Sequence, residues 1–424
     1  MKNKKNIPAL RFPEFTDAWE QRKLGDIIDK LTGGASIAPD DYVEEGYRTI
    51  PKGAVNDTGV ADMSGCKCVS EVFFKKNISS KTSTGELVTS LRDLVPTAPN
   101  MGRIVRIYGD SEDFLMPQGV YSIVLKKDSD EDFLIAYSNS PDYRKIIATE
   151  KNGSTQVHIR NGEFLNIDIP VPTYDEQKRI GATIKNLDNL ITLHQRKCEA
   201  IKKYKKCMLQ KMFPQNGEVV PKLRFPGFPD DWEQCKVGEL VKDHNAGIYI
   251  SKDNYGEGTN VIGVGNIYDS DIFDGEIYRL GPVDDDKFLL EEGDLIYGES
   301  SLVLEGIART VCVGKNGAGS AFAWHTRRVK LDKTKVDSHF ATLELNYHPV
   351  VRKYLMSVAT QTALTGMTTD GYFSAPLFLP SIQEQRKISA VFKDIDNLIT
   401  LHQRKCDVLK ELKQGLLQHM LVSE

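Results

Sequence analysis

The sequence predicts an α+β protein with two globular domains, a pair of long antiparallel coiled-coil helices and a pseudo-twofold internal repeat. Two observations predict this architecture. Residues 10–28 read LRFPEFTDAWEQRKLGDII and residues 223–241 read LRFPGFPDDWEQCKVGELV, with 11 of 19 positions identical. Residues 188–198 and 396–406 both read DNLITLHQRKC. Both halves therefore carry the same order of motifs, and a tandem duplication of a whole domain with its connector explains it, because the period is far too long for a solenoid.

The two motifs and the prolines near them set the expected boundaries. Prolines at positions 170, 172, 214 and 380 limit the long helices, because proline cannot lie inside a helix. We expect a first globular domain at residues 1–173, a long helix at 174–213, a linker at 214–222, a second globular domain at 223–381 and a second long helix at 382–424.

The two globular domains contain short β-branched and aromatic runs that are broken by Gly, Asn and Asp, which is typical of strands joined by turns. Helices are expected at residues 133–140 and 338–356. Expected strands include residues 103–108, 120–125, 261–264, 294–297 and 326–331.

The two long segments have a heptad pattern of apolar residues, sustained over more than four heptads. Each predicted helix spans about 55 Å. Because the two apolar stripes match in length and composition, we expect the helices to pack on each other. The predicted seam includes Ile184, Leu187, Ile191, His194 and Ile201 in the first helix, and Phe392, Ile395, Ile399, His402 and Leu409 in the second.

The seam histidines His194 and His402 have two interpretations. They could form a metal or proton site, or they could set the register of the helix pair. The second is favoured, because no Asp, Glu or Cys lies at coordinating spacing on both helices.

Composition and motifs limit the possible functions. The chain has 424 residues, of which 40% are hydrophobic and 27% are charged, as in globular proteins. No long apolar run predicts a membrane span or a secretory signal. Seven cysteines without a CxxC pair indicate reduced thiols and a cytoplasmic protein. The sequence lacks GxxxxGK[ST], GxGxxG, GxSxG, HExxH and the Asn/Asp-Pro-Pro-Tyr/Phe tetrapeptide of amino-methyltransferases. It therefore predicts no catalytic residue, no metal site and no cofactor of its own.

Charge and loop composition indicate binding instead. The net charge is −4, but residues 178–211 hold ten Lys/Arg against two acidic residues. Arg or Lys can read guanine, Asn or Gln can read adenine, and other basic or hydroxyl groups contact phosphates. Candidate DNA-binding residues are Arg48, Lys52, Lys81, Arg92, Arg103, Lys151 and Gln156 in the first globular domain, and Lys252, Arg309, Arg327 and Gln361 in the second.

The ordered motifs resemble those of the DNA-specificity subunits of type I restriction–modification systems, over essentially the whole chain. The second globular domain departs from the first, because it carries GMTT at 366–369, with Gln361 upstream, where the first carries GSTQ at 153–156. The matching motifs are LRFP at 10–13 and 223–226, WE at 19–20 and 232–233, KLG at 23–25, LTGG at 31–34, IPVP at 169–172, LP at 379–380, and EQ at 176–177 and 384–385.

The resemblance implies a non-enzymatic subunit. Two target-recognition domains would each read half of a bipartite double-stranded DNA target, and the coiled coil would fix the gap and dock two methyltransferase subunits. Those partners would bind S-adenosylmethionine and methylate adenine, while separate motor and nuclease subunits would use ATP and Mg²⁺. Two other classes compete. A coiled-coil adaptor would bind protein and not DNA, and a solitary methyltransferase or nuclease is disfavoured by the missing motifs.

Overall fold

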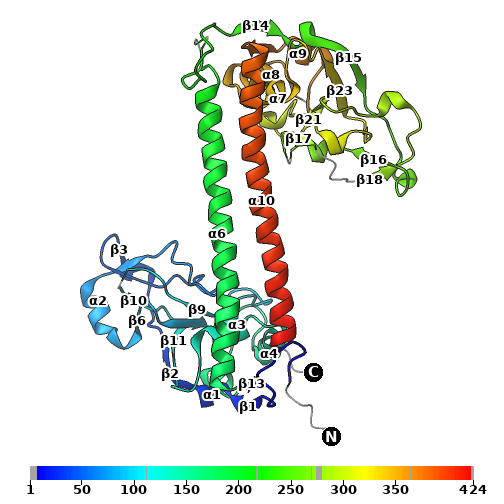
Figure 1. Cartoon of the computed structure of the whole chain (residues 1–424). Coiled ribbons are helices and arrows are strands. Elements are labelled where there is room, and N and C mark those ends of the chain that lie inside the picture. The colour runs from blue at the N-terminus through cyan, green and yellow to red at the C-terminus, as the bar shows by residue number, and fades with distance from the viewer. Residues whose placement is uncertain are drawn as a thin grey trace. The chain divides into compact units, whose positions relative to one another are not determined.

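A computed structural model of the chain describes residues 7–110, 112–215, 218, 220–268, 270–273, 279–361 and 364–421, with residues 252, 279, 280 and 361 described by their backbone alone. The chain divides into two compact units (Figure 1). Unit 1 comprises Met1–Lys197 and His402–Glu424, and unit 2 comprises Cys198–Leu401. We call the globular part of unit 1, residues 7–173, module 1, and that of unit 2, residues 223–381, module 2. The predicted α+β class, with its internal repeat and its two long helices, is confirmed.

Module 1 is built on an antiparallel sheet of four strands in the order β2-β11-β7-β9. Both faces of this sheet are buried, since Leu87 and Val88 are neighbours on β7 and belong to different apolar clusters. The first of these clusters contains Phe133 and Tyr137 of α3 and Tyr143 of α4. The bounds are β2 (Ile28–Gly33), β7 (Leu87–Ser90), β9 (Ile104–Arg106), β11 (Val120–Leu125), α3 (Glu131–Ser138) and α4 (Pro141–Glu150).

Shorter elements complete module 1. They are β1 (Glu20–Lys23), which pairs with β13 (Asp168–Val171); β8 (Arg92–Asp93), which pairs with β12 (Val157–His158); β6 (Lys81–Ser83), which pairs with β10 (Asp113–Leu115); a sheet of β3 (Tyr42–Val43), β5 (Cys68–Val69) and β4 (Tyr47–Arg48); and α1 (Leu24–Ile27), η1 (Pro39–Asp41), α2 (Glu71–Lys76), η2 (Ile78–Ser80) and α5 (Asn161–Leu165).

Module 2 repeats this plan with a sheet in the order β15-β23-β19-β21-β17, in which only β17 is parallel to its neighbour. The prediction of one helix over residues 338–356 is wrong. The chain forms α7 (Ser338–Tyr347) and α8 (Pro349–Ser357), and His348 caps the second through its Nδ1, because Pro349 has no N–H with which to continue the first. The strands are β15 (Val241–Ala246), β17 (Ile272–Phe273), β19 (Leu295–Gly298), β21 (Thr310–Val313) and β23 (Thr326–Leu331).

Shorter elements also complete module 2. They are β14 (Glu233–Lys236), which pairs with β26 (Pro376–Leu379); a sheet of β18 (Arg279–Gly281), β16 (Thr259–Ile262) and β22 (Ala321–Phe322); a sheet of β20 (Ser300–Ser301), β25 (Thr365–Gly366) and β24 (Thr360–Gln361); α9 (Thr369–Phe373); and the short helices η3 (Val237–Leu240), η4 (Lys252–Asn254), η5 (Val264–Ile267), η6 (Asp286–Phe288), η7 (Leu304–Gly306) and η8 (Lys315–Gly317).

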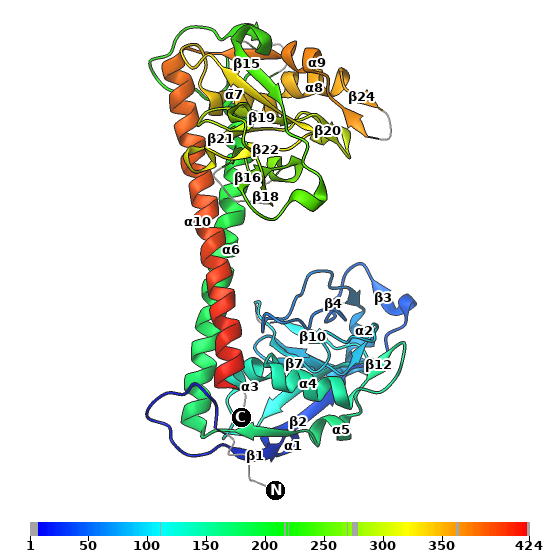
Figure 2. The ribbon, with the colours of Figure 1, turned by 90° about the vertical axis from the view of Figure 1, so that its right-hand side faces the viewer.

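The two long helices are α6 (Tyr174–Met212) and α10 (Ile382–Met420), each of 39 residues. In each unit they run antiparallel, as both views show (Figures 1 and 2). Of the predicted seam residues, Ile184, Leu187, Ile191, Phe392 and Ile395 are buried, whereas His194, Ile201, Ile399, His402 and Leu409 are half-buried. In the part of the chain that the structure describes, neither of these helices nor any other has the length and apolarity that a membrane span requires.

Lysines interrupt the apolar seam at equivalent positions of the two repeats, and each is paired with an aspartate of the other helix. In unit 1, Lys413 Nζ lies 2.5 Å from Asp188 Oδ1. In unit 2, Lys205 Nζ lies 2.7 Å from Asp396 Oδ1. A charge can therefore occupy the seam because an opposite charge compensates it.

The duplicated motifs join each module to the long helices. Arg11 makes a two-pronged ion pair with Glu176 at the start of α6, and Arg224 makes the same pair with Glu384 at the start of α10. Both glutamates are fully buried. In unit 1 the Leu10 N–H donates to the carbonyl of His419, near the end of α10. The LRFP and EQ motifs are thus structural anchors, because their charges pair with each other.

Candidate nucleic-acid interface

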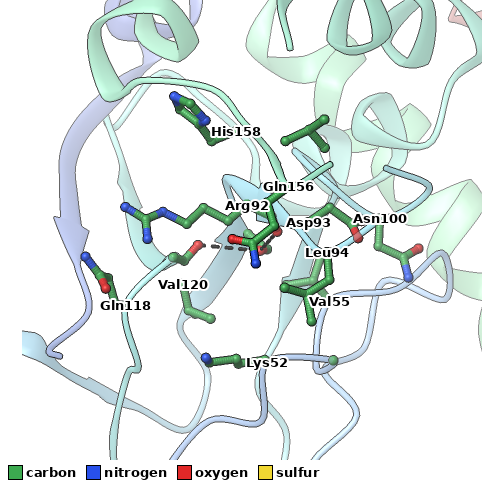
Figure 3. A pocket seen from close by; sticks show the side chains of 14 residues that line it. Lys52, Val55, Arg92, Asp93, Leu94, Asn100, Gln118, Val120, Gln156 and His158 are labelled. Carbon is green, nitrogen blue, oxygen red and sulfur yellow. Dashed lines mark hydrogen bonds between the residues drawn. The ribbon is translucent and has the colours of Figure 1, made fainter. Parts of the chain in front are cut away.

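A cleft of about 550 Å³ opens on module 1 (Figure 3). It brings together three of the sequence-predicted residues, Lys52, Arg92 and Gln156. The three lie on separate segments, namely a turn after β4, strand β8 and the loop before β12. The other polar side chains of the cleft were not predicted from the sequence, and they include Asn100, Gln118 and His158.

Strand pairing places the first group of these side chains. Strands β8 and β12 are antiparallel, with Arg92 opposite His158 and Asp93 opposite Val157. Arg92 and His158 are therefore cross-strand neighbours on one face of the pair. Figure 3 shows these two side chains and that of Gln156 arranged around the cleft.

Two glycines from the sequence motifs position the loops of the cleft. Gly153 of GSTQ has φ +106°, and a Cβ there would lie 2.3 Å from the carbonyl oxygen of Gln156, so the turn that presents Gln156 requires glycine. Gly34 of LTGG lies against the turn that carries Gln118, and a Cβ there would lie 2.1 Å from the Pro117 oxygen. Both glycines are therefore required by close backbone packing beneath the loops of the cleft.

The charge of the cleft suits an anionic polymer. Among the residues that the structure describes, no ion pair engages Lys52 or Arg92. The carboxylate of Asp93 accepts a hydrogen bond from the Val95 N–H at 3.1 Å. Two cations can hold phosphates or guanine, and the amides of Asn100, Gln118 and Gln156 can bind adenine edges.

The other predicted residues of module 1 have protein partners. Arg48 pairs with Glu112 at 3.1 Å and Lys81 with Asp113 at 3.0 Å, both on the surface. Arg103 donates to the carbonyl of Pro99 and to the side chain of Asn139, and burial lowers its pKa. Lys151 donates to the carbonyl of Pro96 at 2.5 Å. Arg103 and Lys151 therefore hold the loop that follows β8.

In module 2 the two predicted arginines are also paired. Arg309 lies 2.7 Å from Asp271, which is almost fully buried, and its guanidinium also donates to Tyr347. Burial lowers the pKa of Arg309, but Asp271 and Tyr347 outweigh it and the pKa is raised. Arg327 pairs with Glu299 at 2.7 Å. Lys252 and Gln361 lie outside the residues whose side chains the structure describes.

Module 2 presents an aromatic side chain where module 1 presents the amide of Gln118. Pro117 bridges to Ala35, which follows β2, and Ala323 makes the equivalent bridge to Ile248, which follows β15. Each of the two residues precedes a central strand, β11 or β23, by the same short turn. Trp324 therefore occupies the position of Gln118. It is half exposed, and its ring lies edge-on to exposed Tyr249, with ring centroids 5.2 Å apart. Neither Trp324 nor Tyr249 was predicted from the sequence, because no local pattern marks them.

Within the described part of the chain, no group of three or more His, Cys, Asp or Glu side chains is placed to hold a metal ion. His194 and His402 contact each other through Nδ1 atoms 2.9 Å apart, so one ring donates and the other accepts.

Comparison with known proteins gives consistent matches over both halves. Residues 16–203 and 229–411 match the family described as type I restriction modification DNA specificity domain. The type I restriction enzyme MjaVIII specificity subunit of Methanocaldococcus jannaschii is 23% identical over 439 residues, covering 100% of this chain and 96% of that protein. The StySPI specificity subunit of Salmonella potsdam is 22% identical over 263 residues, covering 60% of this chain and 56% of that one.

A solved structure shares the fold. The crystal structure of the S subunit of a type I restriction-modification system from M. genitalium superimposes with a TM-score of 0.67 at 14% identity. The match covers 99% of this chain and 100% of that chain.

Proposed function

Because this chain belongs to the type I restriction–modification DNA-specificity family, as a non-catalytic specificity subunit with two DNA specificity domains, we propose that each module reads one half of a bipartite duplex target. The half-sites are expected about one helical turn apart, on the order of 10 base pairs from centre to centre, so that both modules approach one face of the duplex.

The cleft of module 1 carries this proposal. It combines Lys52 and Arg92, which have no ion pair among the described residues, with three amides and a histidine. Cations bind phosphates of any sequence, whereas a guanidinium or an amide can make paired hydrogen bonds to guanine or adenine in the major groove. A surface that only bound acidic protein would not require the amides.

The long helices support the proposed docking of two methyltransferase subunits. Leu190 and Leu193 on α6 are both more than 40% exposed, and so are their equivalents on α10, Leu398 and Leu401. The same apolar pair thus occurs twice, within identical sequence, which suits two copies of one partner. Those methyltransferase partners would bind S-adenosylmethionine, and the motor subunits would bind ATP and Mg²⁺. None of these cofactors is proposed to bind this chain.

A coiled-coil adaptor that binds only protein is the alternative, and the salt dependence of DNA binding separates the two. The complex with methyltransferase subunits is titrated onto duplex DNA over a range of salt concentrations. Neutralised phosphates impose a steep fall of affinity with salt, so we expect a strongly negative slope. An adaptor would bind no duplex at any salt concentration.

Exchange of one module tests whether each module reads its own half-site independently. Residues 21–173 are replaced by the same region of a related subunit, and methylated adenines are then mapped by sequencing. One half of the target should change, while the other half and the gap stay as they are. If both halves change together, the modules do not read DNA independently.

A further inference from the structure

Each module exposes a Leu–Val pair directly after a short strand. In module 1, Leu94 and Val95 follow β8 and are 71% and 46% exposed. In module 2, Leu302 and Val303 follow β20 and are 90% and 57% exposed. We call these two pairs the Leu–Val tips.

The same kind of turn holds both tips. In module 1, Asp93 Oδ1 accepts a hydrogen bond from the Val95 N–H. In module 2, Ser301 Oγ accepts from the Val303 N–H at 3.3 Å. The accepting side chain differs between the two repeats, since it is Asp93 in one and Ser301 in the other, but the turn is retained. Such turns fix the local backbone.

Equivalent arginines clamp the loops that follow the tips. Arg144 on α4 donates to the carbonyls of Met101 and Ala98, and Arg352 on α8 donates to those of Glu305 and Ile307. Burial lowers the pKa of Arg144 to about 10, which leaves it charged at neutral pH. The tips therefore stand on ordered loops.

Single exposed apolar residues are common on protein surfaces and require no explanation. Two observations distinguish these tips. They occur at the same position of two modules whose neighbouring residues differ, with Arg92 replaced by Ser300. In addition, Leu94 lines the same cleft as Arg92, Asn100 and Gln156.

We propose that each Leu–Val tip contacts the C5-methyl group of a thymine in the major groove of its half-site. This inference rests on the proposed function. Amides and guanidinium groups that read base edges make paired hydrogen bonds in the major groove, where the thymine methyl is the apolar feature available to a neighbouring side chain. Leu94 lies beside such groups in module 1 (Figure 3). The tips would thus add thymine selection to the polar readout.

Deoxyuridine substitution tests the contact from the DNA side. Once methylation mapping has given the target, each thymine of a half-site is replaced in turn by deoxyuridine, which lacks only the methyl group. Binding of the complex with methyltransferase subunits is then measured. One position in the half-site read by module 1 should weaken binding about fourfold, as expected for one methyl group removed from an apolar contact. Leu94→Ala should weaken binding to the thymine duplex and abolish the effect of deoxyuridine at that position.

Matched variants separate this contact from other effects. Leu302→Ala should act in the same way on the other half-site and leave the first unchanged. Val72 on α2 is 79% exposed and lies outside the cleft, so Val72→Ala should have no effect.

Three outcomes would overturn the inference. Deoxyuridine could be neutral everywhere while Leu94→Ala reduces DNA bending, which would indicate a wedge in the minor groove. Leu94→Ala could reduce assembly with the methyltransferase, which would indicate a protein contact. Both changes could also be neutral. Failure of the wild-type complex to bind any duplex would instead overturn the proposed function.

Discussion

The Nδ1 atoms of His194 and His402 lie 2.9 Å apart, and the two residues occupy the same position in the two copies of DNLITLHQRKC. Equivalent residues of the two repeats therefore contact each other within unit 1. Two rings in this arrangement need one donor and one acceptor, and a doubly protonated pair has no acceptor.

Acid should weaken this contact. Burial, the facing His402 and the charges of Lys405 and Lys197 lower the pKa of His194 below its ordinary value of 6.5. A histidine with a lowered folded-state pKa stabilises the fold above pH 6.5, and this stability is lost as the pH falls toward the folded-state pKa. We expect the melting temperature of wild type to fall between pH 7 and pH 5 more than that of the double variant His194→Gln, His402→Gln.

Two other histidines supply a background to that measurement. Burial lowers the pKa of His339 and His348 to about 4, so both also destabilise the folded state in acid. They are present in both proteins, and the difference between the two melting curves isolates the seam pair. Identical pH dependence would show that the seam histidines contribute nothing.

Lys205 is expected to stabilise unit 2 strongly. Its ammonium group contacts both Asp271 and Asp396 at 2.7 Å. Burial lowers the pKa of Lys205, but Asp271, Tyr347 and Asp396 outweigh it, and the pKa is raised. Lys205→Met would leave two carboxylates without this cation and should cost about 3–5 kcal/mol of unfolding free energy.

The internal repeat offers a matched control for that substitution. Lys413 is the equivalent lysine in unit 1, and it contacts Asp188 alone among the described carboxylates. Lys413→Met should therefore cost less, about 1–3 kcal/mol. Denaturant unfolding would measure the free energy of unfolding of the two variants. Equal losses of unfolding free energy would contradict the role assigned to Asp271.

Arg309 and Arg92 should respond differently to truncation. The guanidinium of Arg309 is engaged with Asp271 and Tyr347, so Arg309→Ala should lower thermal stability and leave base preference unchanged. Arg92 lines the cleft, and Arg92→Ala should lose about 1–3 kcal/mol of discrimination at one base position. Lys52→Ala should weaken all duplexes alike. Binding to a panel of single-base variants distinguishes these results.

The sequence predicted the parts of the fold that depend on local pattern. Heptad spacing and flanking prolines predicted long helices near residues 174–213 and 382–424, and the structure has α6 at Tyr174–Met212 and α10 at Ile382–Met420. The expected strands at 120–125 and 326–331 agree with β11 and β23. Sheet order was not predictable, because β2 pairs with β11 across a long stretch of chain.

The candidate site was harder to predict, because its residues also come from distant parts of the chain. Arg309 looked like a free cation in a loop, since nothing local indicates that Asp271 lies beside it. Asn100, Gln118 and His158 were not among the predicted residues, because only the folding of three separate segments brings them to one cleft. The duplicated LRFP motifs indicated the repeat and the family resemblance, and the structure shows that their arginines hold each module to a long helix.

The length of the helices is expected to set the gap in the target. Because α6 is continuous from Tyr174 to Met212, four residues inserted after Lys197 would add about 6 Å and rotate the following part by roughly 40°. Such a variant should lose assembly with the methyltransferase or change the gap, because the apolar seam leaves its register. Seven residues inserted after Lys197 and seven after Lys405 keep the heptad phase in both helices. That variant adds about 10 Å, and methylation mapping should show a gap wider by about three base pairs with both half-sites unchanged. An unaltered gap in an assembled, active complex would mean that the helices do not act as the spacer.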